Sequence, residues 1–253
     1  MNRVALHHST VRPMSPVQLV EVARRSGFDS IGLRVAAAPE GDEWWRGGIG
    51  SPMLPALVDA LLDSRVTVLD IGRIELGPEL RSIDVAQPYL RVLGLGPRLG
   101  AQFVTARAGS ADEAGAAGEL FAVLAELARR SQLRALLTVV PGTAVDTLER
   151  AVEIVGPTRG GIVLDVDPAA DPDEVATRVV ELGDLLGYVR LPATSLETGA
   201  EDAAGLLSTL PPQIPVAVGT DEPGCLDRDH VARATALRGQ VETLLRHPRA
   251  RAR

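Results

Sequence analysis

Two adjacent histidines near the N-terminus are the first candidates for moving a proton. His7 and His8 follow the apolar residues Val4–Leu6, and the chain has four histidines in all. Histidine is the side chain whose ordinary pKa lies nearest neutral pH, so either residue could serve as a general acid or base. Neighbouring strand residues point to opposite faces, so one of the two should face the interior of the fold and the other its helix layer. A structural histidine bonded to a backbone carbonyl is the alternative for each.

Four arginines lie at or just after the ends of apolar runs that read as strands: Arg34, Arg73, Arg107 and Arg190. A guanidinium group is always charged and binds carboxylates or phosphates through two parallel hydrogen bonds. The pattern therefore predicts an anionic substrate, such as a carboxylate, a phosphate ester or an enolate. The alternative is that each arginine pairs with a neighbouring acidic residue, of which Glu75 is one, and only neutralises the rim of the site.

Further polar and aromatic residues could complete a binding site. Asp165 could orient or assist the histidine base, or it could be a buried carboxylate paired with an arginine. Glu75 and Thr138 are candidate substrate contacts. Trp44 and Trp45 lie in the segment 36–51, which also holds four glycines and three acidic residues. A long loop of this composition could cover an organic substrate as a lid, or its tryptophans could pack on the rim.

The composition excludes several chemistries. All 26 basic residues are arginine, so neither a lysine Schiff base nor a P-loop lysine is available. A lone cysteine, Cys225, excludes an internal disulfide framework and a cysteine-based metal site. The formal net charge of −7 disfavours nucleic-acid partners. No apolar run approaches about 18 residues and no targeting segment is visible, so we expect a cytoplasmic protein without membrane contact.

Short apolar runs alternate with longer amphipathic stretches along the chain. The runs that predict strands are 4–7, 30–35, 66–71, 102–107, 135–140, 161–166, 186–191 and 216–219. Helices are predicted over 15–26, 52–64, 111–131, 143–155, 172–184, 201–210 and 229–246, with a broken or short helix over 88–99 because Gly94, Gly96 and Pro97 interrupt it. Ser15 and Asp171 are predicted helix caps.

Eight strands alternating with about eight helices over roughly 250 residues are typical of a single (β/α)8 TIM barrel. We assign residues 1–248 to the barrel and 249–253 to a basic, disordered tail. An open doubly wound sheet is the rival, but no Gly-x-Gly-x-x-Gly motif opens a helix after the first strand. Barrel sites lie at the carboxyl ends of the strands, which would bring the candidates above to one mouth, with one of the two histidines facing the barrel axis.

Several segments resemble the xylose isomerase-like TIM barrels, the sugar phosphate isomerase/epimerase proteins related to endonuclease IV. The resemblance is carried by SPVQLVEVARRSGFDSIGLRV (15–35), VTVLDIGRIELGPEL (66–80), LLTVVPGTAVDTLERAVEIVG (136–156), GGIVLDVD (160–167) and YVRLPATS (188–195). The resemblance extends over nearly the whole chain. The resemblance implies a barrel fold and isomerase or epimerase activity supported by one divalent metal at the mouth.

Most of the ligands that the resemblance implies are replaced in this sequence. Asp165 matches a family ligand, whereas the other ligand positions fall on Gly72, Thr138, Pro168, Ala193 and Gly219. One carboxylate cannot hold Mg²⁺ or Mn²⁺, which require several oxygen ligands, so we expect no metal cofactor. The alternative is one divalent metal on a new ligand set: His7, Asp70, Glu75 and Asp165.

These observations lead to two functional hypotheses. The first is an isomerase, epimerase or lyase that acts without a metal on a small anionic or sugar-like metabolite, with His7 or His8 moving the proton, Asp165 assisting, and Arg34, Arg73, Arg107 and Arg190 stabilising an enolate-like charge. The second is a catalytically inactive barrel that binds a ligand or serves as an accessory subunit. A homodimer is the protein partner we expect in either case.

Overall fold

The computed structural model describes residues 2–11, 14–35, 53–82, 86–110, 114–199, 205–219 and 229–246. Trp44 and Trp45, with the rest of the segment expected to form a lid, lie outside the described residues. Cys225 and the basic tail over 249–253 lie outside them as well.

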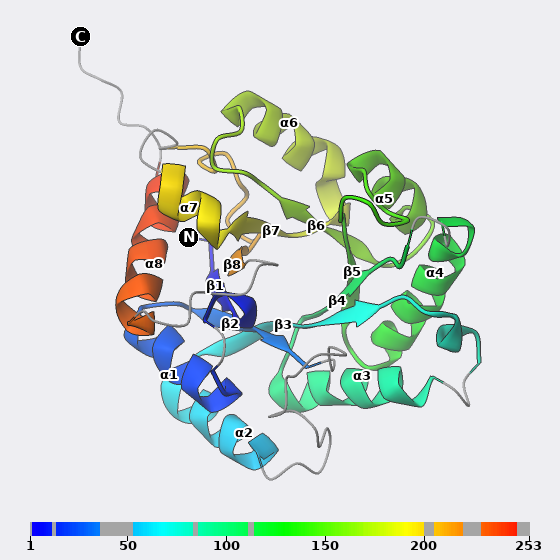
Figure 1. Cartoon of the computed structure of the whole chain (residues 1–253), viewed down its shortest axis with the longest axis horizontal. Coiled ribbons are helices and arrows are strands. Elements are labelled where there is room, and N and C mark those ends of the chain that lie inside the picture. The colour runs from blue at the N-terminus through cyan, green and yellow to red at the C-terminus, as the bar shows by residue number, and fades with distance from the viewer. Residues whose placement is uncertain are drawn as a thin grey trace.

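The described residues contain eight parallel strands that close into a barrel in sequence order, with β1 paired to β8 (Figure 1). This confirms the predicted (β/α)8 fold. The strands are β1 (Val4–His7), β2 (Ser30–Arg34), β3 (Thr67–Glu75), β4 (Phe103–Arg107), β5 (Arg134–Thr138), β6 (Gly161–Asp165), β7 (Leu186–Pro192) and β8 (Val216–Gly219).

Helices surround the strands on the outside of the barrel (Figure 1). Within the described ranges they are α1 (Pro16–Arg25), α2 (Met53–Ser64), α3 (Gln87–Leu99), α4 (Ala114–Arg130), α5 (Leu148–Val155), α6 (Pro172–Leu182), α7 (Ala193–Gly199) and α8 (His230–Leu245). Short 3-10 helices are η1 (His8–Val11), η3 (Pro78–Arg81) and η5 (Gly183–Leu185).

Side-chain caps fix where several helices begin. The Ser15 hydroxyl accepts from the Gln18 amide, and the Gln18 side chain accepts from the Ser15 amide, which together form a capping box ahead of Pro16. Asp171 caps α6 through the Asp173 amide, and Asp229 caps α8. The caps predicted at Ser15 and Asp171 are therefore confirmed.

Helix α3 is continuous, and the prediction of a broken helix was wrong. Pro97 lies in the last turn, where its missing amide removes only one intrahelical hydrogen bond. Gly96 lets the helix approach the Leu133 side chain, since a Cβ at this position would lie 2.5 Å from Leu133 Cδ1. Gly100 ends the helix in the left-handed conformation, with φ of 64°.

Two other predicted helices differ from the structure. Helix α5 begins at Leu148, not 143, because Thr143 turns back on Val140 and forms an isolated bridge with Ser110. The helix in the β7–β8 connection is α7, whereas the described residues 205–210 form turns. The apolar spacing there reflects burial beside α8, since the Leu207 amide donates to the Leu244 carbonyl.

Apolar side chains form two separate cores. The larger core joins strand residues such as Val4 and Leu6 to the helices. The smaller core contains strand residues alone, namely Ala5, Leu69, Leu136, Val163, Tyr188 and Ala217, with Phe103 packed against it. Because side chains alternate along a strand, the residues of the smaller core fill the inside of the barrel.

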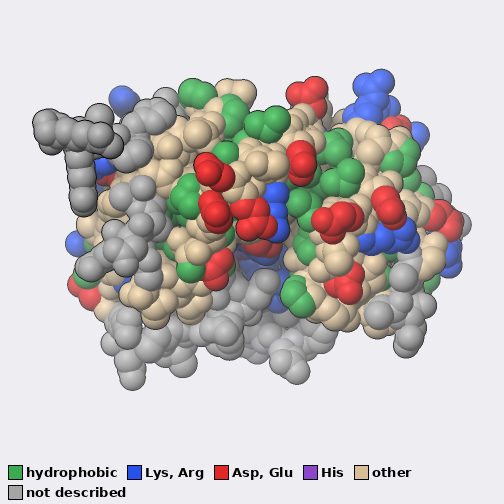
Figure 2. Space-filling model, turned by 90° about the horizontal axis from the view of Figure 1, so that it is seen from above, with side chains coloured by type: hydrophobic (Ala, Val, Ile, Leu, Met, Phe, Trp, Pro, Cys, Tyr) green, Lys and Arg blue, Asp and Glu red, His purple; other side chains and the backbone are tan. Residues whose placement is uncertain are grey.

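Charged side chains are mixed on the face seen in Figure 2, where arginines lie next to acidic residues. Many of the exposed pairs are one helical turn apart, as in Arg24–Glu21 and Arg178–Glu174. Among the described residues, no helix combines the length and the apolar composition needed to cross a membrane.

Two helical glycines should respond in opposite ways to alanine. Gly239 of α8 has no atom within 4 Å of an added Cβ, so Gly239→Ala should raise the free energy of unfolding by about 1 kcal/mol through helix propensity. Gly96→Ala would force its Cβ against buried Leu133 and should lower stability by about 1–3 kcal/mol. Urea denaturation of the two variants measures both values, and equal shifts would contradict the packing assigned to α3.

Candidate functional site

A polar layer lies above the inner core, toward the carboxyl ends of the strands. Each of its residues follows an inner-core residue by two positions and therefore points to the same side of its strand. The pairs are Ala5 and His7, Leu136 and Thr138, Val163 and Asp165, and Tyr188 and Arg190. The structure thus brings four of the predicted site residues, His7, Thr138, Asp165 and Arg190, to one end of the barrel interior.

The His7 imidazole lies between a hydroxyl and a carboxylate. Its Nδ1 is 3.0 Å from Ser9 Oγ. Its Nε2 is 3.7 Å from Asp70 Oδ1, which is within ion-pair range and beyond hydrogen-bond length. The His7 side chain is 12% exposed, and that of Asp70 is fully buried. The His7 side chain therefore lies at the boundary between the buried interior of the barrel and its mouth.

Asp70 is held from inside the barrel by Tyr188. The Tyr188 hydroxyl donates to Asp70 Oδ2 over 2.7 Å, and both residues are fully buried. Asp70 Oδ1, which faces His7, has no hydrogen-bond partner among the described residues. Burial, and next the negative charge of Asp70, raise the pKa of Tyr188 well above its ordinary value, so the phenol stays protonated and donates.

Two glycines make room for this group. A Cβ on Gly32 would lie 2.4 Å from both Asp70 Oδ1 and His7 Cδ2. A Cβ on Gly219 would lie 3.2 Å from His7 Cβ and 3.4 Å from Arg190 Cδ. Position 219 is one of the ligand positions that the family resemblance implies, and a ligand side chain there would compete for the space that His7 and Arg190 fill.

His8 has a different environment. It lies in η1 and is fully buried, and its Nε2 is 2.8 Å from the Met14 carbonyl just before α1. This matches the expectation that only one of the two histidines faces the barrel axis. A contact with a backbone carbonyl is the structural role that was the alternative for each histidine.

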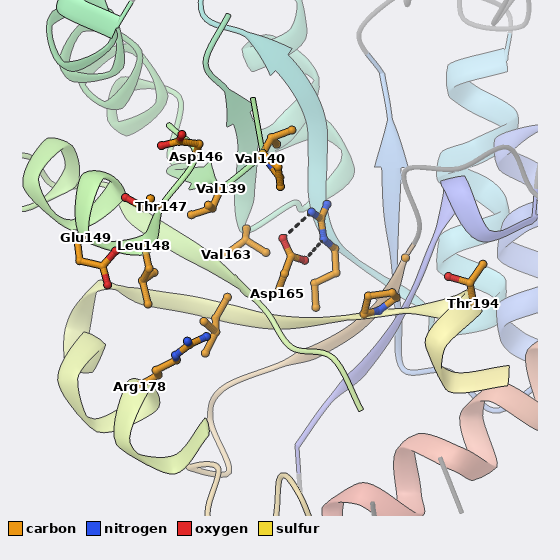
Figure 3. A pocket seen from close by; sticks show the side chains of 15 residues that line it. Val139, Val140, Asp146, Thr147, Leu148, Glu149, Val163, Asp165, Arg178 and Thr194 are labelled. Carbon is orange, nitrogen blue, oxygen red and sulfur yellow. Dashed lines mark hydrogen bonds and ion pairs between the residues drawn. The ribbon is translucent and has the colours of Figure 1, made fainter. Parts of the chain in front are cut away.

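Asp165 and Arg190 form a two-pronged ion pair across neighbouring strands β6 and β7, marked by dashed lines in Figure 3. Arg190 Nε lies 2.5 Å from Asp165 Oδ1, and a terminal nitrogen lies 2.8 Å from Oδ2. The Arg190 side chain is 13% exposed, and the Asp165 side chain is 34% exposed. This planar geometry is the strongest form of an arginine–carboxylate contact.

The other candidate arginines lie at or near the carboxyl ends of their strands. Arg107, at the end of β4, pairs with Glu75, at the end of β3. Arg34 ends β2, and Arg73 lies near the end of β3, each partly buried. Arg107 and Arg190 both have carboxylate partners within the chain, as the rim-neutralisation alternative predicts. Thr138 is buried, and its hydroxyl donates to the Ala106 carbonyl.

A pocket of about 510 Å³ opens beside the Asp165–Arg190 pair. Figure 3 shows Asp146, Thr147 and Glu149 on one side of it and Asp165 on the other. The lining is mixed polar and apolar: Val139, Val140, Pro141, Asp146, Thr147, Leu148, Glu149, Val163, Leu164, Asp165, Arg178, Arg190, Pro192, Thr194 and Gly219. Both hydroxyls and charges of either sign are therefore available to a polar ligand.

The described residues do not fit a divalent metal. No three His, Cys, Asp or Glu side chains among them lie close enough together to hold one. Within the alternative ligand set, His7 and Asp70 are neighbours, but Glu75 is paired with Arg107 and Asp165 with Arg190. Arginine occupies both of those carboxylates, which leaves too few oxygen ligands in this set for Mg²⁺ or Mn²⁺.

The Asp165–Arg190 pair should be strongly coupled in stability. Arg190→Met leaves a partly buried carboxylate without its donors. It should lower the free energy of unfolding by about 1.5–3 kcal/mol, toward the low end because Asp165 is partly exposed to solvent. Asp165→Leu combined with Arg190→Met should cost less than the sum of the single changes. A double-mutant cycle in urea measures the difference.

The exposed pair Arg129–Glu126 on α4 is the matched control for that cycle. Both of its side chains are open to solvent, so its coupling energy should be much smaller than that of the mouth pair. Equal coupling in the two cycles would contradict the special status of Asp165–Arg190.

Sequence reasoning missed several residues of the site: Ser9, Tyr188, Asp146, Thr147, Glu149, Arg178 and Thr194. Tyr188 could have been found, because it precedes Arg190 by two positions on a predicted strand and so shares its face. Asp146 and Thr147 lay inside a predicted helix, which hid their place in the loop that lines the pocket. Asp70 was considered only as a possible metal ligand.

No family model matches the sequence, and no curated protein matches it. Solved structures do match its fold. The 3-keto-D-glucoside 4-epimerase YcjR from E. coli has a TM-score of 0.72 at 14% identity, covering 96% of this chain and 100% of its own. D-allulose 3-epimerase from Methylomonas sp. has a TM-score of 0.71 at 17% identity, with 97% and 99% covered.

The zinc-bound IolI protein has a TM-score of 0.71 at 14% identity, with 97% of this chain and 98% of that one covered. A protein described as a xylose isomerase domain protein from Alicyclobacillus acidocaldarius is 19% identical with a TM-score of 0.67, and the shares covered are 96% and 98%. At these identities the likeness concerns the fold. The chain therefore has the fold of the xylose isomerase-like TIM barrels.

Proposed function

We propose that the mouth of this barrel is the active site of a sugar isomerase- or epimerase-like enzyme that works without a divalent metal. Its substrate would be a small polyhydroxylated or anionic metabolite, and a lyase reaction on such a compound would use the same first step. The observation that carries the proposal is the position of His7, which faces the barrel axis beside a buried carboxylate and, like Arg190, lies close to Gly219.

The chemistry begins with removal of a proton from a carbon next to a carbonyl. The His7 imidazole accepts that proton, and the negative charge that develops on the carbonyl oxygen is stabilised by a nearby cation. Arg190 is the cation at the pocket wall, and its pairing with Asp165 fixes its orientation. Return of the proton to the former carbonyl carbon, with the hydrogen of the adjacent hydroxyl passing to the former carbonyl oxygen, would isomerise the substrate. Return of a proton to the opposite face of the first carbon would epimerise it.

Three further observations support the proposal. The pocket offers hydroxyl and carboxylate groups that suit a polyhydroxylated ligand. His8 bonds to a backbone carbonyl, which leaves His7 as the better base of the two. Structures of the same fold include two named as sugar epimerases.

A ligand-binding barrel without catalysis is the second candidate. The observation that favours it is the internal pairing of Arg107 with Glu75 and of Arg190 with Asp165, which neutralises two of the cations intended for an anionic substrate. Such a protein would bind a sugar-like compound and leave its carbon-bound hydrogens untouched.

Deuterium exchange separates the two candidates. The protein is dialysed against a chelator and incubated in D₂O with pentoses, hexoses, sugar acids and sugar phosphates, and proton NMR follows the C–H signals. We expect at least one compound to lose the signal next to its carbonyl. Exchange that requires added Mn²⁺ would overturn the metal-free mechanism. Binding by saturation transfer without exchange would establish the second candidate.

A further inference from the structure

Four polar side chains form a row from the inside of the barrel to its mouth: Tyr188, Asp70, His7 and Ser9. The Tyr188 hydroxyl donates to Asp70 Oδ2 over 2.7 Å. Asp70 Oδ1 faces His7 Nε2 at 3.7 Å, and His7 Nδ1 lies 3.0 Å from Ser9 Oγ. All four are fully or largely buried. Each nitrogen of the imidazole therefore faces a different kind of group.

We propose that Asp70, anchored by Tyr188, is a positioning residue that holds neutral His7 in the tautomer with its hydrogen on Nε2. The proposal rests on the proposed function in one respect, the use of His7 as the base. At 3.7 Å from Nε2, Asp70 Oδ1 is too far for a direct hydrogen bond, but an acceptor oxygen facing this nitrogen favours a hydrogen over a lone pair there. The lone pair is then on Nδ1, the nitrogen directed toward Ser9. A proton from the substrate reaches it through the Ser9 hydroxyl, which passes its own hydrogen to Nδ1 as its oxygen accepts the substrate's.

The buried carboxylate also prepares His7 for the charge it acquires. Asp70 Oδ1 is fully buried and has no hydrogen-bond donor among the described residues. When His7 takes up a proton, the imidazolium places a positive charge beside this oxygen. The arrangement follows the general plan in which a base is oriented by a third group, here reached through Nε2 in place of Nδ1.

Tyr188 orients the Asp70 carboxylate. Its hydroxyl is buried and protonated, so it needs an acceptor, and Asp70 Oδ2 supplies one. Gly32 has no side chain between Asp70 and His7, which lets the two approach. The carboxylate is thus fixed on one side by a donor and presents its second oxygen to the imidazole.

Substitution of Asp70 by asparagine provides a test that needs no substrate. In Asp70→Asn the amide oxygen must serve the Tyr188 hydroxyl, so the amide NH₂ is turned toward His7 Nε2 and should shift the hydrogen to Nδ1. In the double variant Asp70→Asn/Tyr188→Phe that demand is absent. The amide can rotate, and the Nε2–H tautomer should return. Tyr188→Phe alone should leave the tautomer as it is in the wild type.

The measurement is long-range ¹H–¹⁵N NMR of the histidine rings in the full chain above the titration range of histidine, with His7 assigned by His7→Gln. We expect Nε2–H as the major form in wild type and Tyr188→Phe, Nδ1–H in Asp70→Asn, and Nε2–H again in the double variant. Tyr89→Phe is the control, because this phenol contacts Glu75 and Glu79 at the mouth and not Asp70.

An unchanged tautomer in Asp70→Asn, or a double variant that behaves like the single one, would overturn the proposal. Both substitutions nearly preserve shape, and thermal unfolding checks that each variant is folded. Because the readout is the ring itself, the result is independent of whether any sugar undergoes exchange. A barrel that shows the tautomer switch but no deuterium exchange would retain the positioning pair and lose the proposed function.

Discussion

Replacing His7 with glutamine should reduce deuterium exchange into the substrate by about 10²–10⁴-fold, the usual contribution of a positioned general base. Glutamine retains a polar group of similar reach but cannot take up a proton near neutral pH. Since glutamine is close to histidine in size, the fold should survive the change. The rate is measured by proton NMR in D₂O with the compound found to exchange in the wild type.

His230→Gln is the matched control for that experiment. His230 begins α8 and takes no part in the site described here, so its replacement should leave the exchange rate unchanged. Equal losses in the two variants would indicate a general effect on folding. Full exchange in His7→Gln would remove His7 from the mechanism and leave the proposed function without its base.

The second large effect is expected at Gly32, where an added methyl group has no space. Gly32→Ala would place a Cβ 2.4 Å from both Asp70 Oδ1 and His7 Cδ2. Asp70 is held by Tyr188 and His7 by Ser9, so neither side chain can move without losing a contact. We expect a loss of about 1–3 kcal/mol in the free energy of unfolding. Exchange activity should be lost with it.

Gly219→Ala is the graded comparison for Gly32→Ala. Its nearest contact, 3.2 Å to His7 Cβ, needs a shift of only a few tenths of an ångström, so its effect on stability should be clearly smaller. Urea denaturation of the two variants gives the order. A Gly32→Ala protein as stable as the wild type would show that the mouth is looser than these distances indicate.

The elements of the barrel could be predicted because their apolar runs are short and nearly continuous. Strands β1 and β8 begin and end at the predicted residues. Strand β3 continues to Glu75, beyond the predicted end at residue 71, because Gly72 and Arg73 interrupt the apolar run before Ile74. Residues 206–210 carry a helix-like apolar pattern but form turns, since burial beside α8 selects apolar residues in the same way as a helix does.

The candidate site could be predicted only in outline. The predicted strand ends bring His7, Asp165 and Arg190 to the mouth, where the structure has them, because barrel sites lie at the carboxyl ends of the strands. The bond between Tyr188 and Asp70 could not be predicted, since these residues are 118 positions apart and meet across the barrel interior. The irregular register of β3 beside β2 also turns Asp70 in a way that simple alternation does not describe.

Closure of the barrel by β1 and β8 has a consequence for how the protein is made. Val4 pairs with Val216, so β1 cannot pair with β8 until all the residues between them have been synthesised. Contacts of such long sequence separation form late, because the entropy of closing the loop opposes them. His7 belongs to β1 and Gly219 to β8, so a nascent chain has no assembled mouth until β8 has been synthesised. Until then the free edge of β1 and the free edge of the most recently made strand can pair with other chains. Chaperone protection during translation is therefore most important for these two edges.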